Sequence, residues 1–347
     1  MDLHEGLELG QSLRLVRPLA HGGMASLWVA EHRALGVDVV VKILGPAADA
    51  DCSGRERFER EARVTAKLSS LHVVRILDSP ATASAACARP FLVMELLQGE
   101  DLSVRISREG RLPLAETVTI VEHVALALEK AHGVGIVHRD VKPANVFLVD
   151  GPGGTVAKLV DFGIAKDAAD PHVDLTRAGS LMGTPPFMSP EQVVGEQDVD
   201  WRCDLWSLAV LAYSCLTGKL PFDGATFGAI CVAIHLGRFE PPSVTRLEVS
   251  PRVDAFFTRA LCRVLERRYR GARELSEAFR TAMWSDANLE GQDGATGAFP
   301  GATDEDARDW ATTQLELDGL DEDENLPFAL GRATSGTRST PRLLAQC

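Results

Sequence analysis

The spacing of the apolar residues changes about a hundred residues into this 347-residue chain, and that change constrains the fold more than any other feature. Before it, apolar and polar residues alternate in short runs, as they do in half-buried strands. These runs predict strands at residues 13–19, 26–32, 37–44, 73–77 and 91–96. His21-Gly22-Gly23 marks a turn between the first two. With one helix expected at 57–68, the pattern predicts a mostly antiparallel β lobe over residues 13–96.

From residue 114 onward the apolar residues recur every three to four positions, which is the period of an amphipathic helix. On the first such helix they are Val118, Val121, Val124, Ala125 and Leu128. Further helices are predicted at 201–216, 226–236, 251–265 and 272–283. The first of these four is apolar on almost every side, so we expect it to be buried. The sequence therefore predicts a two-lobed α+β protein with a helical lobe over residues 101–284.

Residues 285–347 differ from the rest of the chain in composition. They hold 13 acidic and 4 basic residues, a net charge of −9 against −13 for the whole chain, and few large apolar residues. Such a segment cannot bury enough apolar surface to offset the entropy lost on ordering. We predict an acidic, disordered tail, and the acidic balance argues against a nucleic-acid partner.

The sequence also bears on where the protein works. No run of about twenty apolar residues is present, and the start MDLHEGLELG lacks the basic and apolar blocks of a signal peptide. The seven cysteines are scattered and are not spaced as metal ligands. We therefore expect a cytoplasmic protein with reduced cysteines and without a membrane span.

The strongest chemical signal is the run His-Arg-Asp-Val-Lys-Pro-Ala-Asn at residues 138–145, followed downstream by Asp161-Phe162-Gly163. Phosphoryl transfer needs a carboxylate at the attacking hydroxyl, and oxygen ligands on the metal ions that bridge the phosphates. Asp140, Asn145 and Asp161 supply these groups in that order. On these motifs the chain resembles the protein kinase family, and in particular the eukaryotic-like bacterial serine/threonine kinases.

The resemblance implies a protein kinase fold over residues 13–284, with ATP between the lobes and transfer of its γ-phosphoryl group to protein Ser or Thr hydroxyls. It implies that Asp140 is the catalytic base and that Lys142 steadies the transferring phosphate. Asn145 and Asp161 would hold Mg²⁺, for which Mn²⁺ can substitute. A lysine at position 142 is typical of serine/threonine kinases rather than tyrosine kinases.

Val39-Val40-Val41-Lys42 resembles the strand of the family whose lysine binds the α- and β-phosphates and pairs with a glutamate of the next helix. By this resemblance Lys42 binds the phosphates and Glu61 is its partner. Glu59 lies close enough to be an alternative, and a solvated charge on the helix surface is the other interpretation of Glu61.

The run at residues 91–97 resembles the segment that joins the two lobes of a kinase. The resemblance makes Met94 the gatekeeper and turns the backbone of Glu95 and Leu97 toward adenine. Glu100 or Asp101 would then reach the ribose.

The loop that covers the phosphates in kinases corresponds to the run Ala20-His21-Gly22-Gly23-Met24-Ala25. Two of the family's three glycines are alanine here, although glycine permits positive φ and close approach of backbone to phosphate. We expect slower turnover or weaker ATP binding. The alternative function is a pseudokinase scaffold, which the presence of Lys42, Glu61, Asp140, Asn145 and Asp161 argues against.

Residues 161–191 resemble a kinase activation segment. Thr184 corresponds to the family's substrate-side threonine, and Arg139 to the arginine that binds a phosphate on this segment. The resemblance implies regulation by autophosphorylation at Thr176 or Ser180, of which Thr176 fits the pattern of bacterial relatives better.

Two further residues are expected to be structural. By resemblance, Arg268 pairs with Glu191 at the end of the activation segment, and Asp204 is a buried aspartate that supports the catalytic loop. In the tail, Thr312-Thr313 resembles ligands of forkhead-associated, phosphothreonine-binding domains. A solubilising tail without a partner is the alternative interpretation.

Overall fold

The computed structural model describes residues 3–22, 25–46, 52–78, 89–151, 154–162, 185–196 and 198–287. The described residues all belong to the first of two units, residues 1–291. The predicted tail lies outside the described residues apart from positions 285–287, which continue the last helix. Its disorder therefore stays a prediction.

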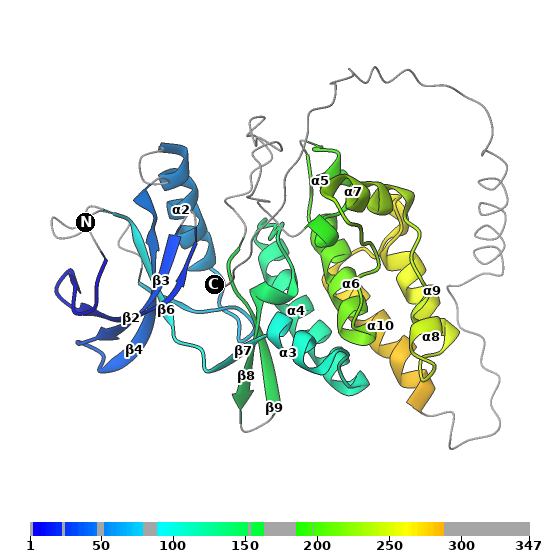
Figure 1. Ribbon diagram of the computed structural model, residues 1–347, viewed down its shortest axis with the longest axis horizontal. Coiled ribbons are helices and arrows are strands. Elements are labelled where there is room, and N and C mark those ends of the chain that lie inside the picture. The colour runs from blue at the N-terminus through cyan, green and yellow to red at the C-terminus, as the bar shows by residue number, and fades with distance from the viewer. Residues whose placement is uncertain are drawn as a thin grey trace, which may run out of the picture. The chain divides into compact units, whose positions relative to one another are not determined.

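The N-terminal part of the first unit is an antiparallel sheet of six strands in the order β1-β2-β3-β4-β6-β5. The strands are β1 Glu8–Leu9, β2 Leu13–His21, β3 Ala25–His32, β4 Val37–Leu44, β5 Ile76–Asp78 and β6 Phe91–Glu95 (Figure 1). Helix α2, Cys52–Thr65, also belongs to this lobe. The β-rich N-lobe is confirmed.

Alternation along β4 determines which side chains lie on the face of the sheet that packs against α2. Val39, Val41 and Ile43 are buried on one face with Trp28 and Phe91. Val40 and Leu44 point to the other face, where they pack with Phe58 and Ala62 of α2. Because successive side chains of a strand point to opposite faces, Lys42 lies on the same face as Val40 and Leu44.

The remainder of the unit is a helical lobe with a three-stranded sheet in the order β7-β8-β9. The strands are β7 Gly99–Asp101, β8 Val146–Gly151 and β9 Gly154–Leu159. The helices are α3 Leu102–Glu109, α4 Leu114–Gly133, α5 Pro190–Val193, α6 Arg202–Thr217, α7 Phe227–Leu236, α8 Pro242–Thr245, α9 Pro251–Ala260 and α10 Ala272–Ala287. No helix among the described residues is long and apolar enough to cross a membrane.

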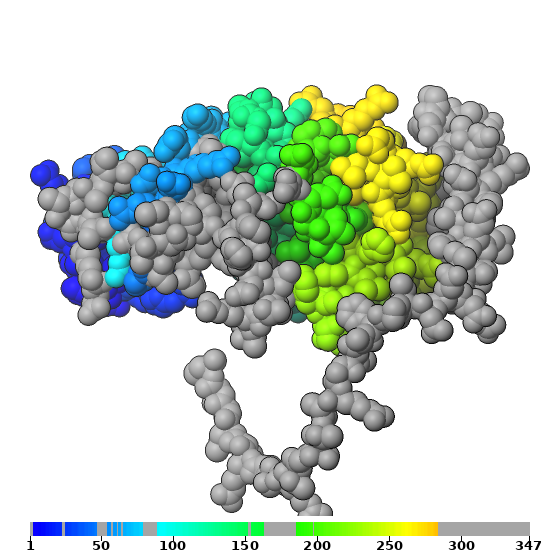
Figure 2. All heavy atoms as spheres, turned by 90° about the horizontal axis from the view of Figure 1, so that it is seen from above, coloured from blue at the N-terminus to red at the C-terminus, as the bar shows by residue number. Residues whose placement is uncertain are grey.

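Helix α6 is the centre of the helical lobe, as its sequence predicts. All of its residues from Cys203 to Thr217 are buried, and they share one core with α4, α9 and α10. On the face drawn in Figure 2, the atoms of these helical elements, green to yellow, pack against one another without a break. The β-rich and helical lobes together confirm the two-lobed α+β architecture.

Two of the predicted elements were too long. The helix expected at 251–265 ends at Ala260, and a separate 3-10 turn, Leu265–Arg267, follows it. The strand expected at 73–77 begins only at Ile76, because Val73 forms an isolated parallel bridge with Leu159 of β9 instead. Val73 and Val74, at the start of this apolar run, therefore contact Leu159 of the other lobe. Such a long-range contact cannot be predicted from the periodicity of the sequence.

Strand β9 is a direct link between the lobes. The N–H of Val74 donates to the carbonyl of Leu159 at 3.1 Å, and the N–H of Leu159 donates to the carbonyl of His72 at 2.8 Å. The rings of His72 and His123 stack with centroids 4.2 Å apart. Nδ1 of His72 lies 3.2 Å from the carbonyl oxygen of Ala157, whose N–H donates to Nδ1 of His123 at 3.2 Å. The loop before β5 is thereby positioned on the strand that leads to Asp161.

His123 should make the stability of the fold depend on pH. Its Nδ1 accepts a hydrogen bond, so the contact needs the neutral ring, and burial together with the charge of His72 lowers the pKa of His123 from 6.5 to about 4. Between these two values the unfolded chain binds a proton that the folded chain does not. The free energy of unfolding should therefore fall as the pH falls through this interval. Above about pH 6.5 His123 should contribute no pH dependence.

The prediction is tested with His123→Phe, which keeps an aromatic ring in the stack but cannot titrate. Thermal unfolding midpoints between about pH 7.5 and about pH 5.5 should fall less in this variant than in the wild type. His235, an exposed histidine on α7, provides the matched control His235→Phe. If His123→Phe and the wild type lose stability equally over this range, the argument is wrong.

Candidate active site

The catalytic-loop residues are positioned by one buried carboxylate, that of Asp204 in the first turn of α6. Its Oδ2 accepts from the backbone N–H of His138 at 2.8 Å, and its Oδ1 accepts from the backbone N–H of Arg139 at 2.7 Å. Nε2 of His132 also lies 2.8 Å from Oδ2. Asp204 is fully buried, so these partners offset the loss of its hydration. The expected supporting role of Asp204 is confirmed by these contacts, and His132 is a partner that the motifs did not reveal.

His138 connects the catalytic loop to the segment that carries Asp161. Its Nδ1 accepts from the N–H of Asp140 at 3.2 Å, so Nε2 carries the proton and faces the carbonyl of Val160 at 3.3 Å. The ring packs on Phe162 with centroids 4.7 Å apart. Burial lowers the pKa of His138, which keeps the ring neutral as this arrangement requires.

The structure brings Asp140, Lys142 and Asn145 together. The ammonium of Lys142 lies 3.0 Å from Oδ2 of Asp140, and both side chains are largely buried. Nδ2 of Asn145 donates to the same Oδ2 at 3.1 Å and to the carbonyl of Asp140 at 2.8 Å. A 3-10 turn, Pro143–Asn145, brings the asparagine back toward the aspartate.

Lys42 and Asp161 meet across the two lobes. Nζ of Lys42 lies 3.0 Å from Oδ1 of Asp161, a carboxylate that stays 46% exposed. Asp161 has φ of +52°, a conformation that few residues other than glycine adopt. Glu61 lies within α2, but its side chain is outside the described part of the structure, so the choice between Glu61 and Glu59 stays open.

The side chains of residues 94–97, in the segment between the lobes, contact neighbouring elements. Met94 is buried and pairs with Val40 of β4. The carboxylate of Glu95 accepts from the backbone N–H of Arg75 at 2.8 Å and lies 2.6 Å from Nζ of Lys158 on β9. Leu97 packs with the cluster between the sheet and α2. The motifs do not reveal Lys158, because its contact with Glu95 depends on how the two lobes meet.

The two candidates for the ribose are already engaged. Hydrogen bonds from Arg108 and Arg105 lower the pKa of Glu100 to about 2. Asp101 caps α3 by accepting from the N–H groups of Ser103 at 2.9 Å and Val104 at 3.1 Å. A ribose hydroxyl would have to share either carboxylate with these partners.

The described part of the phosphate-covering loop is a β-hairpin. Ala20 pairs with Leu27 and His21 with Ser26, and the N–H of Gly22 donates to the carbonyl of Ala25 at 2.9 Å. Gly23 and Met24, at the tip, lie outside the described residues, as do Thr176, Ser180 and Thr184 of the activation segment.

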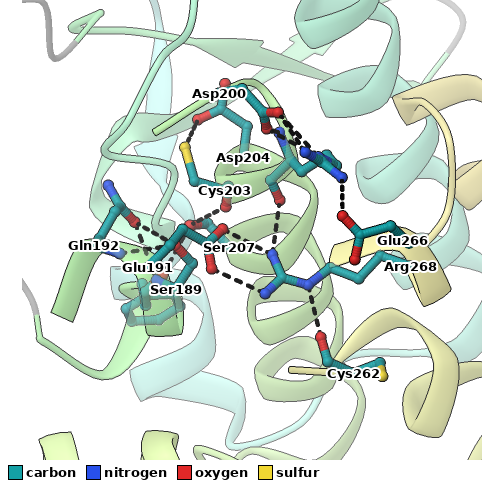
Figure 3. A network of polar contacts seen from close by, with 12 residues as sticks. Ser189, Glu191, Gln192, Asp200, Cys203, Asp204, Ser207, Cys262, Glu266 and Arg268 are labelled. Atoms are coloured by element: carbon teal, nitrogen blue, oxygen red, sulfur yellow. Dashed lines mark hydrogen bonds and ion pairs between the residues drawn. The ribbon is translucent and has the colours of Figure 1, made fainter. Parts of the chain in front are cut away.

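The end of the activation segment is joined to the helical lobe by a buried ion pair. Nη1 and Nη2 of Arg268 lie 2.8 and 2.9 Å from the two carboxylate oxygens of Glu191, and Nε donates to the carbonyl of Cys262 at 2.7 Å (Figure 3). The guanidinium also lies over the ring of Trp206, 4.9 Å from its centroid. The expected pair of Arg268 and Glu191 is confirmed.

Residues 13–278 match the family described as the protein kinase domain. The chain belongs to the protein kinase family. This confirms the resemblance seen in the sequence, and the two-lobed arrangement is the protein kinase fold. Kinases of this family use ATP and a divalent metal ion.

Two curated relatives and one solved structure illustrate the match. The chain is 40% identical over 273 residues to serine/threonine-protein kinase Pkn1 of Myxococcus xanthus, covering 78% of this chain and 38% of Pkn1. It is 38% identical over 282 residues to serine/threonine-protein kinase PknA of Mycobacterium tuberculosis, covering 80% of this chain and 63% of PknA. The chain spans between about a quarter and just under two thirds of the length of these curated relatives and of a second Myxococcus xanthus kinase, pkn2.

The crystal structure of the Mycobacterium tuberculosis PknI kinase domain superimposes with a TM-score of 0.62 at 29% identity. It covers 81% of this chain and all of that domain. Residues 13–278, which match the protein kinase domain family, include every described residue of the candidate site, from Ala20 on β2 to Arg268 before α10.

Proposed function

We propose that this chain is a serine/threonine protein kinase that transfers the γ-phosphoryl group of ATP to Ser or Thr hydroxyls of proteins in the cytoplasm. The observation that carries the proposal is the cluster of Asp140, Lys142 and Asn145, with Asp161 paired to Lys42 nearby. The relatives named as serine/threonine kinases support the choice of hydroxyl acceptor. We assign the catalytic domain to residues 13–284, with lobes at 13–96 and 101–284.

We assign a role to each side chain of the site. Asp140 accepts the proton of the substrate hydroxyl and orients it, and the ammonium of Lys142, 3.0 Å from Oδ2 of Asp140, steadies the transferring phosphate. Lys42 binds the α- and β-phosphates, with Glu61 as its partner from α2. Met94 and the backbone of Glu95 and Leu97 border the adenine.

The residues present also fit a magnesium ion, for which manganese can substitute. Nδ2 of Asn145 already donates to Asp140, so the amide oxygen of Asn145 is the atom left for a cation. Asp161 offers a carboxylate that is 46% exposed as a second ligand. Amide and carboxylate oxygens are ligands that Mg²⁺ prefers, with phosphate oxygens and water completing its shell. The bound ion would neutralise charge that develops on the phosphates.

Asp140→Asn tests the proposal most directly. The amide keeps the size of the carboxylate and can still accept from Asn145, but it cannot take up a proton. We expect kcat on a generic protein substrate to fall by about two to four powers of ten, with the Kd for ATP nearly unchanged. Asp150→Asn, at an exposed position on β8, is the matched control and should keep wild-type activity.

Radiolabel transfer with both proteins purified in the same way excludes a contaminating kinase. If the wild type binds ATP and its rate of transfer does not differ from that of Asp140→Asn, the chain is a pseudokinase scaffold.

We also propose that autophosphorylation of the activation segment regulates the kinase. Arg139 is adjacent to the catalytic base, and its guanidinium would bind a phosphate on Thr176 or Ser180, with Thr184 on the substrate side. Thr176→Ala and Arg139→Gln should each lower activity, and the double variant should be no worse than the more severe single variant, because both remove one interaction.

Mass spectrometry of the wild type and of Asp140→Asn measures the modification itself. The wild type should carry phosphate within residues 166–183, and Asp140→Asn should not. Additive losses in the double variant, or activity unaffected by phosphatase, would contradict this regulation.

The acidic segment at 285–347 is proposed to select partners rather than to support catalysis. No family catalytic motif lies beyond Arg268, and phosphorylated Thr312 or Thr313 would suit a forkhead-associated domain. Deleting residues 292–347 should leave kcat on a generic peptide unchanged and should reduce the set of proteins that co-purify with the kinase. Loss of peptide activity argues against the first half, and an unchanged set argues against the second.

A further inference from the structure

The peptide group between Arg139 and Asp140 is held at both ends by side chains. Arg139 has φ of +64°, in the left-handed region that is unfavourable for L-residues. The N–H of Asp140 donates to Nδ1 of His138 at 3.2 Å. On the opposite edge of the same peptide, the carbonyl of Arg139 accepts from Nε2 of Gln192 at 3.1 Å. This unfavourable backbone conformation is therefore supported from two directions.

Gln192 reaches this peptide from α5, at the end of the activation segment. Its Oε1 accepts from the backbone N–H of Ser189 at 3.0 Å, which completes a capping box at the start of the helix. A backbone N–H only donates and a carbonyl only accepts, so the two partners determine which end of the amide faces each of them. The glutamine thus uses its oxygen for α5 and its nitrogen for the catalytic loop.

Helix α5 is itself held in place beside α6. Figure 3 shows Ser189, Glu191 and Gln192 next to one another, with the carboxylate of Glu191 directed at Arg268. The hydroxyl of Ser207 on α6 donates to the carbonyl of Phe187, just before this helix, at 2.7 Å. The side chain of Gln192 therefore reaches the catalytic loop from a helix whose position is held by contacts with Arg268 and Ser207.

We propose that Gln192 is a positioning residue for Asp140, which couples the end of the activation segment to the orientation of the catalytic carboxylate. The Cα of Asp140 belongs to the peptide that Gln192 contacts, so rotation of this peptide turns the side chain. Misplacement of a catalytic group by about 1 Å can cost about a hundredfold in rate. This inference rests on the proposed function, in which Asp140 receives the proton of the substrate.

Gln192→Glu separates positioning from capping. A carboxylate still accepts from the N–H of Ser189, and glutamate is a common residue at this position of a capping box. It cannot donate to the carbonyl of Arg139 and instead places a charged oxygen against it. We expect kcat to fall by about ten- to a hundredfold at neutral pH, while KM for ATP and the thermal midpoint stay close to those of the wild type.

The pH profile gives a readout that a capping role would not change. Once protonated, the introduced carboxyl has one O–H donor and can again serve the carbonyl of Arg139. The ratio of kcat for Gln192→Glu to kcat for the wild type should therefore rise as the pH is lowered from about 7.5 to about 5.5. Gln192→Met, which has neither donor nor acceptor, is the matched control, and its ratio should stay low and constant.

Hydrogen exchange of the backbone around residues 138–142 tests the contact without relying on activity. Exchange should be faster in Gln192→Glu and Gln192→Met than in the wild type at neutral pH. A wild type that phosphorylates nothing would defeat the proposed function, and the exchange would still report on the contact. An active wild type with the same kcat, pH profile and exchange as Gln192→Glu would overturn the inference. So would a loss of kcat in Gln192→Glu that does not depend on pH and leaves exchange unchanged.

Discussion

The candidate active site depends on one buried carboxylate, that of Asp204. It lies in the first turn of α6, where the helix dipole favours negative charge, and it accepts two backbone N–H groups of the catalytic loop together with a contact from His132. Hydrogen bonds to a charged group contribute about 1.5 to 3 kcal/mol each. These interactions place His138 and Arg139, and through them the peptide that leads into Asp140.

The fixed position of Asp204 follows from the burial of α6. Because this helix is buried on all sides, its side chains contact several neighbouring segments. Asp204 serves the catalytic loop, and Ser207, one turn further along, serves the end of the activation segment. Arg268 closes the arrangement, because its guanidinium pairs with Glu191 and lies over the ring of Trp206. The loop that carries Asp140 and the end of the activation segment thus share one support.

Strand β9 makes several of the contacts between the lobes that the structure describes. This strand accepts the loop before β5 on its backbone, carries Lys158 to the carboxylate of Glu95, and lies against the stacked histidines. It ends at Leu159, two residues before Asp161, which pairs with Lys42. A change in the angle between the lobes would therefore alter two contacts together, that of Lys42 with Asp161 and that of Lys158 with Glu95.

Much of this protein could be predicted from its sequence. Alternation of apolar residues predicted β4 at its observed bounds. The apolar character of α6 predicted its burial, and the order of Asp140, Asn145 and Asp161 indicated phosphoryl transfer. These are local properties, since they depend on residues close in the chain and on the chemistry that the residue types permit. The two alanines of the glycine loop are likewise visible in the sequence, although their effect on turnover is not.

Other features were decided only by the tertiary structure. The contacts of His132 with Asp204, of Lys158 with Glu95 and of Gln192 with the carbonyl of Arg139 join residues 72, 63 and 53 positions apart. Val73 contacts the other lobe instead of extending β5, and Glu100 is bound to arginines that the motifs do not include. A hydrogen bond needs a donor and an acceptor within about 3 Å, and only the packing of the lobes brings such distant groups together. The sequence by itself determined which chemistry the chain can perform, and the packing around α6 and β9 decided how its groups are held.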